Sequence, residues 1–132
     1  MKFIQIFAVF LLFLSGCAHV QRESGLKTYV QGIFSEDAEE LDEAIGYYRE
    51  TIRKAGESSY IYVKMGNLYL KKQDAKEAKK CFFRAIRLTP DMHEAFFGLG
   101  VAYMLEKNNA QAVVYMEKGL ALQPENHGVR IL

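Results

Sequence analysis

The chain has 132 residues, half of them apolar and a quarter charged, as in one modest globular unit rather than a disordered or collagen-like chain. Its 17 Lys and Arg against 16 Asp and Glu give a formal net charge of +1. Phosphate binding needs clustered excess positive charge, so this balance argues against a nucleic-acid partner. Two cysteines are too few for a disulfide scaffold.

The N-terminal segment has the features of an export signal. Lys2 supplies a positive charge, and residues 3–14, FIQIFAVFLLFL, are apolar apart from Gln5. This run lies within the roughly 7 to 15 residues of a secretory apolar region and below the roughly 18 of a membrane-spanning helix. Residues 1–16 are therefore predicted to be a signal peptide outside the fold.

The tetrapeptide Leu14-Ser15-Gly16-Cys17 ends this segment. It resembles the lipobox of bacterial lipoproteins, in which an aliphatic residue and two small residues precede a cysteine. The resemblance implies that the Cys17 thiol is alkylated by a diacylglycerol, that cleavage falls just before it, and that its new amino group is acylated as well. Several acyl chains together give stable membrane anchoring. The alternative is an ordinary signal peptide cut after Ala18, because Gly16 and Ala18 also form a small-x-small site.

The lipoprotein resemblance also carries an expectation for location. Ala18, which follows the lipidated position, is not aspartate, and in bacteria with two membranes this implies transfer to the outer membrane. We therefore expect a chain in the cell envelope, anchored by lipid in the outer membrane and facing the periplasm. Residues 17–25 contain the lipidated cysteine, are mostly polar and end in glycine, as suits a short tether.

The remainder of the sequence is repetitive. Identical residue types recur at intervals of 34 positions: Gly32, Gly66 and Gly100; Ala44, Ala78 and Ala112; and Pro90 and Pro124. Aromatic residues recur in the same register, as at Tyr69 and Tyr103. These blocks resemble tetratricopeptide repeats (TPR), whose pattern is W-x2-L-G-x2-Y, then A-x3-F, then P.

The TPR resemblance implies the fold class and the division of the chain. The expected fold is all-α, a TPR-type α-solenoid of antiparallel helix pairs. The expected parts are a divergent first repeat over 25–58, a second over 59–92, a third over 93–126 and an uncapped C-terminal tail over 127–132.

Helix boundaries can be predicted from residues at equivalent places in the second and third repeats. Asp74 and Glu77, like Asn108 and Gln111, have the spacing of a capping box at a helix N-terminus. Pro90 lacks an amide hydrogen and has a fixed φ, so the second helix of its repeat should end before it. The small Gly66 and Gly100 are expected where two helices cross closely.

The first repeat is a weaker copy. It keeps the small and aromatic residues Gly32, Ala44 and Tyr48. Other pattern positions are changed to residues that do not fit the motif: Thr28, Gln31, Ser35, Thr51 and Gly56. The sequence therefore supports the second helix of this repeat better than the first.

The C-terminal end lacks a polar helix that would close the stack, as such arrays normally need for solubility. An apolar face is predicted to lie partly open there, formed by Val113, Val114, Met116 and Leu120. Two interpretations follow. Either the chain is a truncated copy of a longer repeat protein, or this end is an interface with a partner or with a second copy.

In TPR proteins the first helices of the repeats line a concave groove. The resemblance places the groove at the second, fifth, ninth and twelfth positions of each repeat. The predicted partner-binding residues are Tyr29, Ile33, Tyr60, Val63, Asn67, Leu70, Phe97, Val101 and Met104. Val63 and Phe97 stand where carboxylate-binding members carry lysine, so an apolar helix face or an extended hydrophobic peptide is the expected ligand.

Sites for chemistry are not indicated. His19, His93 and His127 are widely separated and have no metal-ligand spacing, and no catalytic or phosphate-binding motif occurs. Cys81 precedes the packing residue Phe82 and is expected to fill space rather than act as a redox centre. The prediction is a non-enzymatic chain without cofactor or metal.

The predicted function is that of a lipid-anchored adaptor. Its groove would hold a peptide or helix of another cell-envelope protein, in the assembly of a complex such as a pilus or a secretion system. The alternatives are the repeat arm of a longer enzyme, or a structural lipoprotein that self-associates through its uncapped end.

Overall fold

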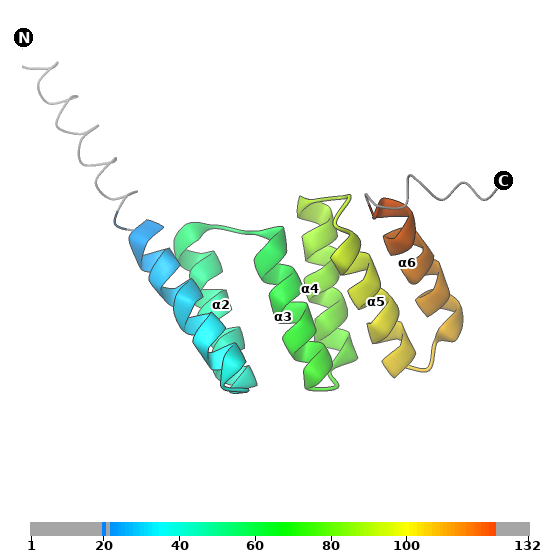
Figure 1. Cartoon of the computed structure of the whole chain (residues 1–132), viewed down its shortest axis with the longest axis horizontal. Helices are drawn as coiled ribbons and strands as arrows, with labels where there is room; N and C mark the ends of the chain where they lie inside the picture. The colour runs from blue at the N-terminus through cyan, green and yellow to red at the C-terminus, as the bar shows by residue number, and fades with distance from the viewer. Residues whose placement is uncertain (1–19, 21, 124–132) are drawn as a thin grey trace, which may run out of the picture. The chain divides into compact units, whose positions relative to one another are not determined.

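The computed structural model describes residues 20 and 22–123 (Figure 1). Within this range the chain forms six helices and no strand. A helix over residues 22–37 is followed by α2 (Leu41–Ala55), α3 (Ser59–Lys71), α4 (Ala75–Leu88), α5 (His93–Leu105) and α6 (Asn109–Leu122). The predicted all-α fold is confirmed. Cys17, the signal peptide, Pro124 and the tail over 127–132 lie outside the described residues.

The chain divides into two compact units, Met1–Glu57 and Ser58–Leu132. Unit 1 contains the helix over residues 22–37 and α2, and unit 2 contains α3 to α6. No helix in the described parts of either unit is long and apolar enough to cross a membrane.

The two helices of unit 1 form an antiparallel pair around Tyr48. This side chain of α2 is fully buried, and its ring fills the space that a Cβ on Gly32 would need, 2.8 Å away. The Tyr29 ring packs beside it with centroids 5.9 Å apart, and the Tyr48 hydroxyl donates a hydrogen bond to Glu36 at 2.7 Å. The first helix of the weak repeat therefore forms, and an aromatic residue fixes it to the second.

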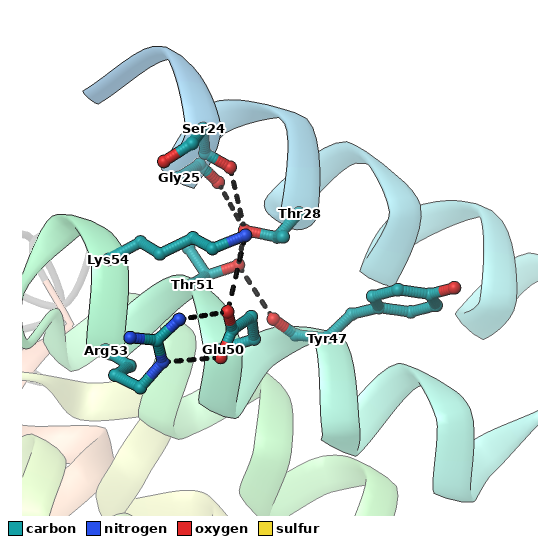
Figure 2. A network of polar contacts seen from close by, with 8 residues as sticks. All are labelled: Ser24, Gly25, Thr28, Tyr47, Glu50, Thr51, Arg53 and Lys54. Atoms are coloured by element: carbon teal, nitrogen blue, oxygen red, sulfur yellow. Dashed lines mark hydrogen bonds and ion pairs between the residues drawn. The ribbon is translucent and has the colours of Figure 1, made fainter. Parts of the chain in front are cut away.

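A buried pair of hydroxyls replaces apolar packing in unit 1 (Figure 2). Thr51 Oγ1 donates to Thr28 Oγ1 at 3.1 Å, and Thr28 Oγ1 donates to the Gly25 carbonyl at 2.9 Å. Thr28 stands where the other two repeats carry an aromatic residue, and Thr51 where they carry Ala85 or Gly119. Each hydroxyl has a partner, so its burial leaves no unsatisfied polar group.

Unit 2 is built from two antiparallel helix pairs, α3 with α4 and α5 with α6. Helix α4 also packs against α5, and α3 touches α5. The fully buried Phe82 of α4 lies at the centre of this packing, with Gly66 of α3 and Gly98 of α5 beside its ring. Position 66 therefore has to be small because the Phe82 ring of the partner helix occupies the space beside it.

The predicted helix starts in unit 2 are confirmed, but only half of each capping box forms. Asp74 accepts a hydrogen bond from the Glu77 amide at 3.1 Å, and Asn108 accepts one from the Gln111 amide at 3.3 Å. The reciprocal arm is absent at Asp74, because its own amide donates to the Tyr69 carbonyl of the preceding helix.

The predicted helix end before Pro90 is also confirmed. Helix α4 ends at Leu88, and Thr89 has the extended backbone that sterics impose on a residue preceding proline. In unit 1, α2 ends differently. Gly56 occupies the equivalent place with φ of 96°, a left-handed conformation in which glycine has no steric penalty.

The turn inside each helix pair places a residue other than glycine in the left-handed region. Glu39, Gln73 and Lys107 all have φ of 60° and are spaced by 34 residues. In each turn the next amide donates to a carbonyl five residues back, as Asp74 N does to Tyr69 O at 2.9 Å. This is the longer hydrogen bond of a Schellman ending.

Replacing Gln73 by glycine should therefore stabilise the chain. An L-residue in the left-handed region costs roughly 1–2 kcal/mol, and glycine removes most of this cost while losing some backbone entropy, so we expect a gain of about 1 kcal/mol. Urea unfolding followed by circular dichroism measures the change. Lys72→Gly is the matched control because Lys72 has φ of −77°, where glycine has no advantage. Equal effects of the two changes would contradict the assignment.

Candidate partner-binding face

The predicted groove residues of unit 2 form one stripe on each of α3 and α5. On α3 they are spaced as positions i, i+3, i+7 and i+10, beginning at Tyr60, which places them along one side of a helix. The stripe on α5 is spaced identically and ends at Met104. Helices α3 and α5 are in contact, so the two stripes lie on neighbouring helices. We call them together the α3–α5 face.

Apolar side chains are accessible on this face. Tyr60 is 51 % exposed and Met104 is 53 % exposed, and Val101 is also exposed. Asn67, seven residues after Tyr60 on the α3 stripe, is also exposed, and its side-chain amide offers both a hydrogen-bond donor and an acceptor. The arrangement suits a ligand that buries apolar groups and makes a few backbone hydrogen bonds.

Val63 differs from the others. It was predicted to face a ligand, but its side chain is only 6 % exposed and belongs to the core. Leu70 and Phe97 are half-buried, and the Phe97 ring packs edge-on against His93 with centroids 6.4 Å apart. The fifth position of the repeat is thus partly a packing position in this chain.

Tyr29 and Ile33 lie in unit 1, on the helix over residues 22–37. Both are half-buried. Tyr29 packs against Tyr48 of α2, so part of its surface serves the core of its own unit. Neither residue is assigned here to the α3–α5 face of unit 2.

An aromatic cluster in unit 2 was not predicted from the sequence. The rings of Tyr103 and Tyr115 stack with centroids 5.2 Å apart and an interplanar angle of 5°. Phe83 meets Tyr115 edge-on at 6.0 Å, and the Lys79 ammonium lies 4.7 Å from the centre of the Tyr103 ring. The cluster joins α4, α5 and α6, and pairing the helices in antiparallel register could have indicated the Tyr103–Tyr115 contact.

Ionisable groups with shifted pKa values lie on α2 and α4. The pKa of Glu50 on α2 is lowered to about 2, mainly by its hydrogen bond with Arg53 and also by Lys54 (Figure 2). Glu50 and both partners lie on the same helix with partly exposed side chains, which is typical of a surface ion pair rather than of a catalytic group. Beside Glu50, residues Glu43, Gly46 and Tyr47 line a shallow open depression on α2.

No metal site is indicated in the part of the chain that the structure describes. Residues 20 and 22–123 contain no group of three or more His, Cys, Asp or Glu side chains placed to hold a metal ion. Cys81 is buried within α4.

Comparisons with known proteins identify the fold. Residues 63–127 match the family model described as tetratricopeptide repeat. The chain is similar to the second TPR domain of human RPAP3 in complex with the HSP70 peptide SGPTIEEVD, with 27% identity and a TM-score of 0.70 over 83% of this chain and 88% of that chain. A comparison with curated proteins found no match.

Two further solved structures show the same likeness. The second TPR of Spaghetti (RPAP3), bound to the HSP90 peptide SRMEEVD, has 23% identity and a TM-score of 0.72, covering 80% of this chain and 99% of that chain. MamA has 21% identity and a TM-score of 0.72, covering 78% of this chain and 60% of that chain. The chain therefore has the all-α TPR fold, which typically serves as a non-catalytic scaffold for protein interactions.

Proposed function

We propose that this chain is a non-catalytic adaptor, anchored to a membrane of the bacterial cell envelope, that binds a peptide or helix of another envelope protein through the α3–α5 face. The observation that carries the binding role is the exposure of Tyr60, Val101 and Met104 on neighbouring first helices of a TPR fold. Exposed apolar groups gathered on one face are the usual mark of a protein-interaction site.

The chemistry of the face favours an apolar ligand. The RPAP3 domains hold peptides that end in the acidic sequence EEVD. In this chain the fifth repeat positions, Val63 and Phe97, are apolar and at least half-buried, so they offer no cation to a carboxylate. A helix that places apolar side chains at i, i+3 and i+7 against Tyr60 and Met104 would bury them, with Asn67 bonding its polar edge.

Membrane anchoring is proposed from the sequence. The lipobox ending at Cys17 supplies the lipidation site, and the polar residues that follow are a suitable tether. Lipid attachment would hold the adaptor at the membrane surface, where the effective concentration of a membrane-bound partner is high. An outer-membrane location facing the periplasm and a role in assembling an envelope complex belong to this proposal.

A cross-linking pull-down from membranes tests the binding face. The full chain is compared with a Tyr60→Glu/Met104→Glu variant, in which two accessible apolar groups become charged without change to the core. We expect the parent to capture a specific envelope protein and the variant to capture at least about tenfold less, because each buried unpaired carboxylate costs several kcal/mol.

Leu88→Glu is the matched control for this experiment. Leu88 is an exposed apolar residue at the end of α4, a helix that contributes no residue to the proposed face, so this variant should capture the partner as the parent does. Equal capture by the parent and the double variant would show that the partner binds elsewhere and would overturn the assignment of the α3–α5 face.

A further inference from the structure

Apolar side chains are exposed on both the first and the last described helices. On the helix over residues 22–37, Val30 and Phe34 lie one turn apart, and Phe34 is 69 % exposed. On α6, Val113 is 53 % exposed and Met116 is half-buried. We call Val30 and Phe34 the leading face, and Val113 and Met116 the trailing face. Single exposed apolar residues mean little, but each of these pairs stands at repeat positions that are part of the α4–α5 interface.

The packing of α4 against α5 shows how the second helix of one repeat meets the first helix of the next. The Lys79 ammonium lies 2.6 Å from the Glu106 carboxylate and 4.7 Å from the centre of the Tyr103 ring. Further along α4, the Phe82 ring fills the space that a Cβ on Gly98 would need. The helices run antiparallel, so these contacts define the register of the interface.

The trailing face on α6 stands at the repeat positions that α4 uses to contact α5. Val113 stands 34 residues after Lys79, and Met116 stands 34 residues after Phe82. Within residues 22–123 no helix follows α6. The side of α6 that corresponds to the α5-facing side of α4 therefore keeps much of its apolar surface exposed.

The leading face on the helix over residues 22–37 stands at the repeat positions that α5 uses to contact α4. Val30 stands two repeat lengths before Gly98, and Phe34 stands two repeat lengths before Ala102. Gly98 and Ala102 are both buried in unit 2. The equivalent side of the helix over residues 22–37 is exposed and carries larger apolar side chains.

From this equivalence we propose that copies of this chain associate head to tail, with the trailing face of one copy packed on the leading face of the next. The contact repeats the α4–α5 interface one step beyond the end of the chain. In that register Met116 meets Val30, and two side chains of medium size replace the large ring and the glycine of the α4–α5 interface. Their combined volume is similar, as close packing requires.

The ion pair between Lys79 and Glu106 in the α4–α5 interface has no charged residue at either equivalent position of the proposed contact. Val113 takes the place of Lys79, and Ala38 takes the place of Glu106. An isolated change would leave one charge facing an apolar group, which is costly when water is excluded. The paired change instead makes the contact apolar, with Phe34 beside Val113, so the two surfaces are complementary.

This association is heterologous, because the two faces in contact are different surfaces. Such a contact leaves one face of each kind open at the ends, so it continues into chains longer than a dimer. It does not involve the α3–α5 face, so partner binding and self-association can be tested separately.

Cysteine cross-linking of the full chain in membranes tests the proposal. One variant carries both Phe34→Cys and Val113→Cys, and two others carry one change each with different tags. With a short bis-maleimide, we expect a ladder of dimers, trimers and larger species from the double variant. The single variants should cross-link to each other when produced together, but not to themselves. The parent chain gives the background from Cys81, because the alkylated Cys17 of the proposed lipoprotein has no free thiol.

A matched pair of added substitutions tests the register. Met116→Glu in the double-cysteine variant should reduce the ladder at least about tenfold, because it places a carboxylate in the contact. Leu88→Glu, which adds a carboxylate at an exposed apolar residue outside the leading, trailing and α3–α5 faces, should leave the ladder unchanged. A ladder insensitive to Met116→Glu would overturn the proposed packing.

Three other outcomes would also overturn it. Cross-linking of the Val113→Cys chain to itself would show that two α6 faces meet around a two-fold axis. A ladder that forms only after removal of residues 124–132 would show that the chain's own C-terminus covers α6. Cross-links from both cysteine positions to a different protein, without self-cross-links, would assign these faces to that partner.

Discussion

Replacing Phe82 by alanine should lower the free energy of unfolding by about 3–5 kcal/mol. Phe82 is 0 % exposed, and its ring lies against Gly66 and Gly98, where added Cβ atoms would approach it to 2.6 Å and 2.3 Å. Glycine has no side chain that could move into the space left by the ring. The cavity would therefore stay open, which places the cost toward the upper part of this range. Denaturant unfolding followed by circular dichroism measures it.

Phe83→Ala is the control for this prediction. Phe83 is the next residue in α4, and its substitution removes the same number of atoms. Its side chain, however, is exposed and contacts the Tyr115 ring edge-on. Its loss should cost about 1 kcal/mol. A Phe82→Ala chain as stable as the Phe83→Ala chain would show that the helices of unit 2 can close around the missing ring.

Changing Cys17 to alanine should release the chain from the membrane. If Cys17 carries the acyl chains, its loss removes all of the lipid that holds the protein, since buried acyl carbons contribute about 0.8 kcal/mol per methylene. We expect the chain to move from the membrane fraction to the soluble fraction and to lose incorporated labelled fatty acid. Washing membranes with high salt before the comparison removes chains held only by surface charge.

Cys81→Ala is the matched control, because Cys81 is buried in α4 and is not followed or preceded by a lipobox. This chain should stay in the membrane fraction with its label. Fatty-acid label kept by the Cys17→Ala chain, or absent from the parent chain, would show that Cys17 is not the lipidation site and would remove the basis for the proposed lipoprotein.

Repeat spacing gave the sequence most of its power to predict this fold. The recurrence of Gly66 and Gly100 at an interval of 34 positions predicted where small residues are needed between packed helices. Asp74 and Asn108 predicted two helix starts, and each side chain accepts a hydrogen bond from the amide three residues later. These features are local or strictly periodic. Steric fit and backbone hydrogen bonding at a single turn determine them, so a linear pattern is enough to reveal them.

The candidate site was less predictable. The stripe on α3 was assigned by repeat position, yet Tyr60 is exposed while Val63, three residues later on the same stripe, is buried. Burial depends on how closely neighbouring helices approach a given side chain, and the repeat pattern does not encode this distance. The face is therefore narrower than the sequence predicted.

The sequence by itself determined the repeat, the α4 boundary before Pro90 and the fold class, because these follow from periodic spacing and from the backbone limits of individual residues. Only the tertiary structure decided that the weak first repeat folds as a helix pair. There the Thr51 hydroxyl donates to Thr28, 23 residues away, the Thr28 hydroxyl donates to the Gly25 carbonyl, and the Tyr48 ring packs against Gly32. Replacements that look unfavourable one at a time are compatible as a pair, and the contact between them exists only once the helices have packed.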